Sequence, residues 1–327
     1  MTLTTSRAFV TGISGQDGSY LAERLLADGA EVHALHHAEE PPPAHCPSGV
    51  VLHHGDLLDV PGIRALLLDL APDEVYNLAA LSSVAQSWAE PDLTSRLNGG
   101  AAVALLESAY LVQERSGRPV RFVQASSAEI FGEPARSPQD EDTPLRPVSP
   151  YGAAKAYAHL MVEVQRRRGL HAVSAILYNH ESPRRPTRFV TRKITSTVAA
   201  IAAGRADGLA LGNLDARRDW GWAPDYVDAM VRAARSDLAR DYVIATGVGH
   251  TVREFVAAAF ARAGIVDWAP LVTCDPALVR PADPADLTGD ASRARRDLGW
   301  TPTVSFEELV GRMVDADLSQ PGLSEPG

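Results

Sequence analysis

Cysteine is scarce in this sequence, negative charge outweighs positive charge, and no long apolar run occurs. The two cysteines, Cys46 and Cys274, are too few for a disulfide framework or a four-ligand zinc site. The formal net charge of −10 argues against non-specific binding to nucleic acid or membranes, which needs a basic face. A local arginine cluster could still bind an anionic small molecule.

Signals for export, membrane insertion and metal binding are also missing. The first residues, MTLTTSRAFVTG, contain no basic segment followed by an apolar core, and no apolar run approaches membrane-spanning length. Two histidine pairs, His36–His37 and His53–His54, are poorly spaced for a metal, because neighbours on a strand point to opposite faces. We therefore expect a protein of the reducing cytoplasm that binds no metal, membrane or nucleic acid.

The first half of the chain alternates short apolar runs with helical patterns. Strict alternation of strand and helix predicts parallel strands with helical crossovers, which is an α/β fold with a doubly wound (Rossmann) sheet. Ligands of such sheets bind at the carboxyl ends of the strands. The expected strands are 7–12, 31–37, 50–57, 73–80, 121–127 and 171–179, and the expected helices are 19–29, 61–72, 97–117 and 151–169.

After Asn179 this rhythm changes. The stretch 179–189 is polar and broken by proline, which predicts a loop, and 211–225 is charged and irregular. A capping box, Thr251 with Glu254, starts a helix. We expect a dinucleotide-binding domain over 1–178, to which a segment of about 223–248 returns, and a smaller α/β nucleotide-sugar-binding domain over 179–327. Further helices are expected at 190–204, 226–237 and 251–264, with a strand at 241–247.

The first expected strand runs into the glycine-rich turn TGISGQDG, which opens a helix. Gly12, Gly15 and Gly18 let the backbone approach a pyrophosphate, and the helix start supplies N–H donors and positive potential. This position, between a strand and a helix, favours a dinucleotide site over an empty tight turn. Asp56 follows the third strand, where it could accept a hydrogen bond from adenine or cap a helix.

Tyr151 and Lys155 are spaced to share one face of a helix. A free tyrosine has a pKa of about 10, too high for a base at neutral pH. A nearby ammonium would stabilise the phenolate and lower this pKa. Tyr151 could then take the proton of a sugar hydroxyl while a nicotinamide takes the hydride.

These stretches together resemble the extended short-chain dehydrogenase/reductase family. The resemblance is carried by TGISGQDG, GDLLD, YNLAA, Asn98, the strand ending in serine, YGAAK and, near the C-terminus, GDASRARRDLGW. Longer stretches, NHESPRR, FVTRKI, GNLDARRDWG and VIATG, are similar to the branch that dehydrates GDP-mannose. The resemblance spans almost the whole chain and implies a 4,6-dehydratase, a lyase that regenerates its nicotinamide cofactor.

The resemblance also implies a course for the reaction. The sugar is oxidised at C4, which acidifies the C5 proton. A carboxylate removes that proton, the C6 hydroxyl leaves as water, and the hydride returns to C6. Glu129 would act as the C5 base and as the acid for the leaving hydroxyl, and Ser127, where the family has threonine, would hydrogen-bond the C4 oxygen. Tyr151 and Lys155 would complete the catalytic set.

The ligand contacts implied by the resemblance lie in both halves of the chain. Asn179 and Arg218 would hold the pyrophosphate, and Val190 and Lys193 would line the guanine pocket. Trp220 is expected in the core. The implied cofactor contacts are Gly12, Gly15, Gln16, Asp17, Gly18, His37, Asp56, Leu57, Leu78, Ala79, Ala80, Tyr151, Lys155, His180 and Arg185. The implied substrate contacts are Ser82, Ser127, Glu129, Asn179, Val190, Lys193, Arg218, Arg280 and Asp283.

Two departures from the family pattern qualify these expectations. Arginines that hold the extra phosphate of NADP are replaced by His37 and Ala38, followed by two glutamates and three prolines. The resemblance implies NADP, but this change predicts a weaker preference for NADP and use of NAD. In the family the same loop also reaches a neighbouring subunit, so its change makes the family's tetramer less certain. We expect a homo-oligomer, which is either a dimer or a tetramer. Leu81 and Ser83 replace a glutamine and a histidine near the hexose.

Three functions remain open at this point. GDP-mannose is the expected substrate of a dehydratase, and another GDP-sugar is an alternative because of the changes at Leu81 and Ser83. A reductase or epimerase of a GDP-4-keto-hexose would need Ser127, Tyr151 and Lys155 but no base at C5. A non-catalytic dinucleotide sensor is disfavoured, because such proteins tend to lose the tyrosine or the lysine.

Overall fold

A seven-stranded parallel sheet forms the larger part of the protein. The computed structural model describes residues 6–37, 39–279, 282, 284 and 286–319. The sheet has the order β10-β6-β5-β4-β1-β2-β3, and every pairing in it is parallel. This confirms the predicted doubly wound α/β fold. The strands are β1 (Arg7–Thr11), β2 (Glu31–His36), β3 (Val51–His54), β4 (Glu74–Asn77), β5 (Arg121–Ser127), β6 (His171–Leu177) and β10 (Asp241–Ile244).

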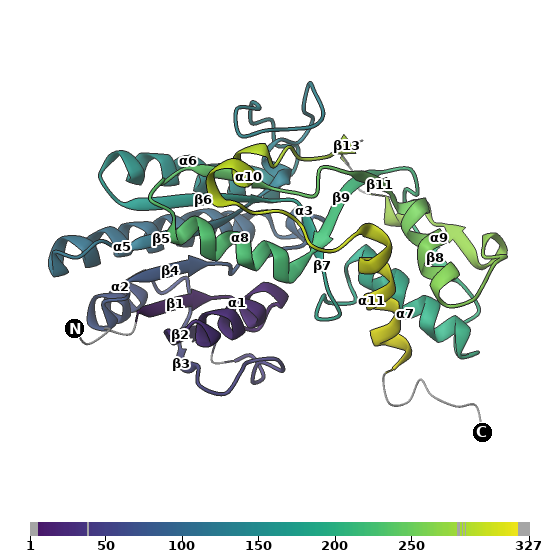
Figure 1. Cartoon of the computed structure of the whole chain (residues 1–327), viewed down its shortest axis with the longest axis horizontal. Helices are drawn as coiled ribbons and strands as arrows, with labels where there is room; N and C mark the ends of the chain where they lie inside the picture. Colours follow the sequence, from purple (N-terminus) through teal and green to yellow (C-terminus); the bar gives the residue numbers. More distant parts are fainter. Residues whose placement is uncertain (1–5, 38, 280–281, 283, 285, 320–327) are drawn as a thin grey trace.

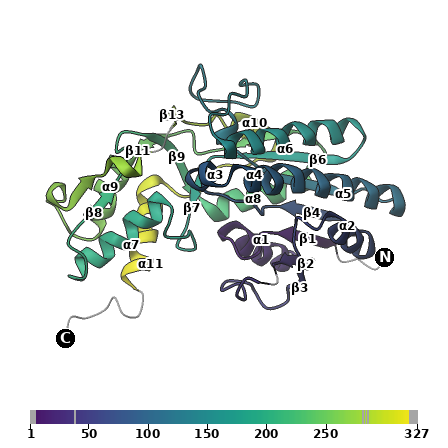
Figure 2. The ribbon, with the colours of Figure 1, turned by 180° about the vertical axis from the view of Figure 1, so that it is seen from behind.

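Helices cover both faces of this sheet (Figures 1 and 2). On one face, α1 (Gln16–Ala27) packs beside α8 (Ala223–Arg235). On the other face, α2 (Val60–Leu70), α5 (Ala102–Ser116) and α6 (Pro150–Arg167) lie side by side. Apolar side chains of the inner strands are fully buried between these layers, as expected when both faces of a parallel sheet are covered.

A π-helical turn, η1 (Ser95–Ala101), precedes α5 and fixes the loop after β4. Asn98 lies in this turn, and its side chain donates to the carbonyl oxygen of Leu81 (3.0 Å) and accepts from its N–H (2.8 Å). Two short helices, α3 (Val84–Ala89) and α4 (Pro91–Thr94), complete the connection. The loop after β4 is thus held at the carboxyl edge of the sheet.

The remainder of the chain forms a smaller unit with its own core (Figure 1). A four-stranded sheet contains β7 (Asn179–Glu181), β9 (Arg217–Trp222), β11 (Gly249–Thr251) and β13 (Asp286–Leu287). Trp220 is buried in this core, as expected. The other elements are α7 (Val190–Ala202), α9 (Val252–Arg262), α11 (Phe306–Leu318), the pair β8 (Leu209–Leu211) with β12 (Val272–Cys274), and the short helices η3 (Ala269–Leu271) and η4 (Pro276–Leu278).

Two strands of this smaller sheet lie where the sequence predicted a loop or irregular structure, and β11 and β13 were not expected either. β7 lies within the stretch predicted to be a loop, and β9 within the stretch predicted to be irregular. Four consecutive residues of β9, from Arg218 to Gly221, are buried, so the strand shows no alternation, and two of them are charged. A fully buried strand with charges has neither of the patterns on which strand prediction depends.

The chain returns twice to the large sheet. α8 and β10 lie within the predicted returning segment of about 223–248. A second segment also packs in the core of the large sheet, where α10 (Ser292–Leu298) precedes Trp300, whose indole N–H donates to the carbonyl oxygen of Asp225 (2.8 Å). The division into domains at residues 178 and 179 stays a prediction.

Neither a membrane span nor a metal cluster is found in the described ranges. No described helix combines the length and the apolar character needed to cross a bilayer. Within the same residues, no group of three or more histidine, cysteine, aspartate or glutamate side chains is arranged to hold a metal ion.

Candidate active site

The turn between β1 and α1 fits a bound dinucleotide. Gly12 has a φ of +81°, and a Cβ there would lie 2.9 Å from the backbone nitrogen of Ala79. A Cβ on Gly18 would lie 2.1 Å from the carbonyl oxygen of Gly12. Glycine is therefore required for α1 to begin so close to the turn, where its first N–H groups lack intrahelical partners and can bind a pyrophosphate.

Other predicted cofactor residues lie at the same edge of the sheet. His37 follows β2, Asp56 and Leu57 follow β3, and Leu78–Ala80 follow β4. Because these strands are parallel neighbours of β1, their carboxyl ends meet beside the glycine-rich turn. The alternative that Asp56 caps a helix, which the sequence left open, is wrong. Asp59 caps α2 by accepting from the N–H of Gly62 (3.2 Å), whereas Asp56 accepts from the N–H of Leu58 (2.9 Å).

The segment after β2 brings a carboxylate onto the glycine-rich turn. The hydroxyl of Ser14, between Gly12 and Gly15, donates to Oε2 of Glu40 (3.1 Å). The carbonyl oxygen of His37 accepts from the N–H of Glu40 (3.1 Å), which closes a tight turn. One of the two glutamates that follow the missing arginine pair is therefore placed beside the expected cofactor.

Ser127, Tyr151 and Lys155 lie together at the carboxyl end of β5. Ser127 is the last residue of β5, and Tyr151 and Lys155 lie on the first turns of α6. The hydroxyl of Ser149 caps this helix by accepting from the N–H of Gly152 (3.0 Å). Ser127, Tyr151 and Lys155 are each at most 9% exposed, so they form a buried cluster. In this cluster Tyr151 is hydrogen-bonded to Ser127.

Burial shifts both titratable groups of this cluster. It raises the pKa of Tyr151 to about 12, with a further rise from the charge of Glu129, while the hydrogen bond to Ser127 acts in the opposite direction. Burial lowers the pKa of Lys155 from 10.5 to about 8. The net shift of the Tyr151 pKa is therefore upward, not the lowering that was expected from Lys155, whose ammonium donates to the carbonyl oxygen of Ala125 (2.9 Å) and lies 5.8 Å from the ring centroid.

Glu129 follows directly in the turn η2 (Ala128–Ile130). Its N–H donates to the hydroxyl of Ser127 (3.2 Å). A Cβ on Gly152 would lie 2.5 Å from the carbonyl oxygen of Glu129, so α6 begins in direct contact with this turn. The charge of Glu129 raises the pKa of the Tyr151 phenol. A carboxylate, a phenol and a serine hydroxyl are thus gathered at one point.

A buried ion pair joins the glycine-rich turn to the smaller unit. His180 Nε2 lies 2.8 Å from Oδ2 of Asp17, and His180 Nδ1 lies 2.7 Å from the carbonyl oxygen of Tyr178. Burial lowers the pKa of His180, but the charge of Asp17 outweighs it and the net shift is upward; burial likewise raises the pKa of Asp17, and His180 reverses this. Gln16 adds a hydrogen bond to the carbonyl oxygen of His180 (3.1 Å).

The residues expected to bind the nucleotide sugar lie on β7, α7 and β9. Asn179 and Trp220 are partners between β7 and β9, and Arg218 lies two residues before Trp220. The guanidinium of Arg218 donates to the carbonyl oxygen of Pro284 (2.8 Å) and is almost fully buried. Val190 and Lys193 are half-buried on the first turn of α7. Arg280 and Asp283 lie outside the described residues.

Two other expected contacts differ in their surroundings. Arg185 Nε lies 3.3 Å from the buried carboxylate of Glu181, and its guanidinium lies 3.7 Å from the ring centroid of Phe189. Ser82 is half-buried in the loop after β4. The next residue, Ser83, caps α3 by accepting from the N–H of Gln86 (3.1 Å). The change at Ser83 therefore has a local structural role.

The sequence analysis missed a row of polar side chains beneath the site. Thr11 donates to Oδ1 of Asn77 (2.7 Å), and the amide of Asn77 donates to Oε1 of Gln124 (2.9 Å), across three adjacent strands. The amide of Gln124 reaches the carbonyl oxygen of Ala125, which also accepts from Lys155. All of these side chains are buried. Thr11 and Asn77 end their strands, and Gln124 lies in the middle of β5. These polar residues within buried strands were the signal that could have revealed the row.

The sequence matches known proteins over most of its length. Residues 9–313 match the family model described as GDP-mannose 4,6 dehydratase. The chain belongs to the GDP-mannose 4,6-dehydratase family. GDP-mannose 4,6 dehydratase 2 of Arabidopsis thaliana is 45% identical over 324 residues, covering 95% of this chain and 86% of the relative. The Homo sapiens and Vibrio cholerae enzymes are 41% and 39% identical, each over 95% of this chain and over 91% and 94% of their own lengths.

Solved structures of sugar-nucleotide enzymes share the fold. UDP-glucose 4-epimerase of Thermus thermophilus, in complex with NAD, is 31% identical, with a TM-score of 0.83 over 96% of this chain and 99% of that one. UDP-glucose 4-epimerase of Thermotoga maritima, with UDP-glucose, is 25% identical, with a TM-score of 0.84 over 95% and 98% of the two chains. Together with the glycine-rich turn, these likenesses support a nicotinamide cofactor for this family member.

Proposed function

We propose that this protein converts GDP-mannose to GDP-4-keto-6-deoxymannose with the loss of one water. The observation that carries the proposal is the position of Glu129 directly after β5, beside Ser127 and Tyr151, in a chain that belongs to this family. Oxidation and reduction at C4 alone would need the serine, the tyrosine and the lysine. The added carboxylate gives the site a base for the C5 proton.

The residues of the site divide the chemistry between them. Tyr151 takes the proton of the C4 hydroxyl, and Ser127 donates a hydrogen bond to the C4 oxygen as it becomes a carbonyl. Glu129 then removes the C5 proton and gives it to the C6 hydroxyl, which leaves as water. The proton held by Tyr151 is the one that C5 gains at the end. One water is lost in total, and the cofactor ends in its starting redox state.

A nicotinamide bound at the glycine-rich turn would supply the acceptor for the C4 hydride and its return to C6. Gly12, Gly15 and Gly18 would hold its pyrophosphate at the start of α1, for the steric reasons given above. The ammonium of Lys155 donates to the carbonyl oxygen of Ala125 and lies 5.8 Å from the centroid of the Tyr151 ring, from where its charge can stabilise the phenolate.

The experiment that tests the function is mass spectrometry of GDP-mannose after incubation with the purified protein. The incubations contain no cofactor, NAD or NADP. We expect loss of one water without a net change in cofactor redox state. Net consumption of reduced cofactor with a 4-keto sugar would favour a reductase instead. Turnover of another GDP-hexose, without turnover of GDP-mannose, would show that the substrate is a different sugar. The changes at Leu81 and Ser83 would then be the first to test as its cause.

We propose further that the cofactor preference is shifted from NADP toward NAD. The carboxylate of Glu40 lies on Ser14 of the glycine-rich turn, where it would repel a 2′-phosphate and could accept a hydrogen bond from an unphosphorylated ribose. The substitution Glu40→Arg should shift the ratio of kcat/KM for NADP over NAD upward about fivefold, since an exposed charge pair contributes about 1 kcal/mol or less. Glu40→Gln is the matched control and should give a smaller shift. Tightly bound NADP in the purified wild-type protein would refute the preference.

We also propose that two copies associate through α6. Tyr157, Leu160 and Val164 are 50%, 52% and 47% exposed and lie at helical spacing on one face of this helix. A contiguous apolar stripe of this kind marks an association surface. Leu160→Glu should convert a dimer to a monomer in light scattering, whereas Val266→Glu, at a 93% exposed valine elsewhere, should leave the mass unchanged. A monomeric wild-type protein would contradict this, and a tetramer would require a second interface.

A further inference from the structure

The segment of residues 131–149, called here the connecting segment, lies between the two parts of the catalytic cluster. Glu129 precedes it in η2, and Tyr151 follows it in α6. Its two ends are joined, because the N–H of Arg146 donates to the carbonyl oxygen of Ile130 (3.1 Å). Gly132 has a φ of +54°, and a Cβ there would lie 1.8 Å from the carbonyl oxygen of Arg146. A shift of this segment would therefore displace both catalytic side chains.

Gln139 anchors the connecting segment at its centre. The residue is fully buried, and it forms a β-bridge with Gly289. Its N–H donates to the carbonyl oxygen of Thr288 (2.8 Å), and its carbonyl oxygen accepts from the N–H of Asp290 (2.7 Å). Its side-chain amide donates to Arg136 within the segment, and Oε1 accepts from the hydroxyl of Tyr178 (2.9 Å). Both the backbone and the side chain of Gln139 therefore hold the connecting segment in place.

The partner of Gln139, residues 286–290, is called here the strap, and it is fixed to β9 from the other side. β13, at the start of the strap, pairs with β9, with Leu287 opposite Arg218. The buried carboxylate of Asp219 accepts from the N–H of Gly289 (3.3 Å) and from the N–H of Gly247 (2.9 Å). Asp219 directly follows Arg218, the residue expected to hold the pyrophosphate of the sugar nucleotide. Strap and nucleotide contact therefore share one strand.

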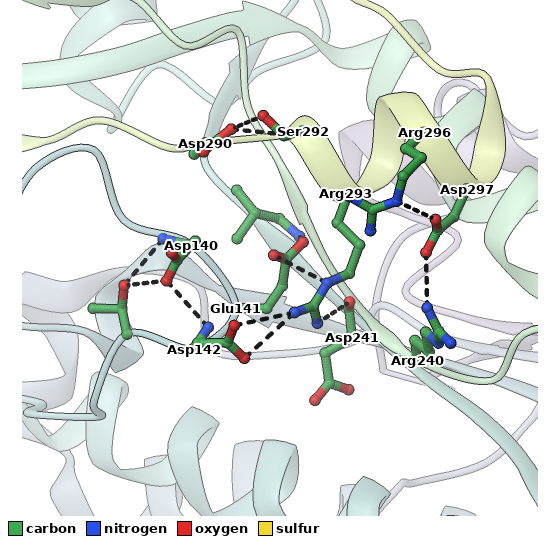
Figure 3. A network of polar contacts seen from close by, with 12 residues as sticks. Asp140, Glu141, Asp142, Arg240, Asp241, Asp290, Ser292, Arg293, Arg296 and Asp297 are labelled. Atoms are coloured by element: carbon green, nitrogen blue, oxygen red, sulfur yellow. Dashed lines mark hydrogen bonds and ion pairs between the residues drawn. The ribbon is translucent and has the colours of Figure 1, made fainter.

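A second set of charges ties the same segments together (Figure 3). Glu141 of the connecting segment accepts from the N–H of Val243 in β10 (2.8 Å), and its other oxygen lies 3.4 Å from Nε of Arg293 in α10. Arg293 Nη2 lies 3.4 Å from the exposed carboxylate of Asp142. α10 directly follows the strap. The connecting segment thus contacts both the strap and the helix behind it.

We infer that Gln139 is a positioning residue for the dehydration, holding Glu129 and Tyr151 in place and coupling them to the strand that carries Arg218. The inference rests on the proposed function. Buried contacts run from Arg218 and Asp219 through Gly289 to Gln139 without a break, and the hydroxyl of Tyr178 completes them. Occupation of the nucleotide site therefore orders the connecting segment, although none of the residues proposed to contact the GDP-sugar belongs to it.

The first test removes a single hydrogen bond. Tyr178→Phe deletes the hydroxyl that donates to Gln139 while keeping the buried ring. We expect kcat for GDP-mannose to fall about tenfold, with KM changed less than about twofold, because misplaced catalytic groups lower the rate more than binding. Tyr242→Phe is the matched control, since this buried tyrosine of β10 donates to the carbonyl oxygen of Leu238 (3.2 Å), outside the connecting segment and the strap, and the variant should keep the wild-type kcat. Equal kcat in both variants would overturn the inference.

Gln139→Leu removes the acceptor of the same hydrogen bond. If the two side chains act together, the double variant should lose no more activity than Gln139→Leu alone. Additive losses would show that Tyr178 acts on its own and would overturn the assignment to Gln139.

The coupling has a readout besides activity. Hydrogen exchange of the wild-type protein is measured with and without saturating GDP. We expect GDP to slow exchange several-fold at residues 133–149 as well as in β9 and α7, and Tyr178→Phe to lose only the protection of 133–149. Protection of β9 and α7 without protection of 133–149 in the wild type would overturn the inference alone. Failure of GDP to bind would overturn the proposed function and the inference with it.

Discussion

Replacing Glu129 by glutamine is expected to allow one round of C4 oxidation and to stop the loss of water. The amide has nearly the shape of the carboxylate, and the N–H of residue 129 still reaches the hydroxyl of Ser127, so the fold and Tyr151 should be preserved. An amide cannot accept the C5 proton or return it to the C6 hydroxyl. We expect the dehydration rate to fall on the order of 10³-fold, which is within the usual effect of a general acid–base group.

The measurement follows the cofactor and the sugar in the same sample. Reduced nicotinamide should accumulate to about one equivalent per site on mixing with GDP-mannose, while mass spectrometry finds no product lighter by one water. Glu133→Gln is the matched control, because this glutamate lies four residues further along in an exposed position and should not affect turnover. Full dehydratase turnover in Glu129→Gln would refute the assignment of the C5 base. Absence of both signals would indicate that the variant no longer binds or oxidises the sugar.

The large sheet could be predicted from the sequence because short strand segments and helical segments alternate regularly along the first half of the chain. β1, β4, β5 and β6 are short, almost fully buried strands, and the helices between them bury the side chains of one face. The glycine-rich turn and the spacing of Tyr151 and Lys155 are local features, so they can be recognised in the sequence without knowledge of tertiary contacts. The catalytic side of the site was therefore accessible from the residues and the family resemblance alone.

The remaining parts depend on contacts that a local pattern does not contain. Gln139 looks like a surface residue in the polar stretch after Glu129, yet it is fully buried because a strap from the far end of the chain covers it. Asp219 likewise looks like a surface charge in the sequence, but its carboxylate holds the backbone N–H groups of two separate loops. In both cases a distant segment of the chain supplies the partner.

The pKa of Tyr151 illustrates a different limit. The sequence predicted the lysine but not where its ammonium would lie. In the protein alone Lys155 is bound to a strand carbonyl, and burial together with Glu129 raises the pKa of the phenol to about 12. The pKa of the phenol therefore depends on its burial and on Glu129 as well as on the presence of a lysine.

Tyr151→Phe should stop the reaction earlier than Glu129→Gln. Without the phenol no group takes the proton of the C4 hydroxyl, so C4 oxidation should fall on the order of 10³-fold and neither reduced cofactor nor dehydrated sugar should appear. The two variants thus separate the two halves of the cycle. Tyr242→Phe is the control for loss of a buried phenol hydroxyl away from the site. Accumulation of reduced nicotinamide in Tyr151→Phe at the wild-type rate would assign the proton transfer to another group.

The pH dependence of kcat/KM tests the other member of the pair, because this ratio reports the ionisation of the free enzyme. C4 oxidation needs Tyr151 deprotonated and Lys155 charged, so kcat/KM should rise with pH as more phenolate forms. This rise should end near pH 8, where Lys155 loses its charge, well before Tyr151 titrates near 12. Unfolding linked to Lys155 cannot cause kcat/KM to level off in this way. Its folded pKa lies below the ordinary 10.5, so protons leave the folded state first, and its contribution to the free energy of unfolding rises between pH 8 and 10.5. A rise in kcat/KM that ends near pH 8 while the melting temperature holds would therefore identify the loss of the ammonium charge, and a rise that continues unbroken to pH 10 would exclude it.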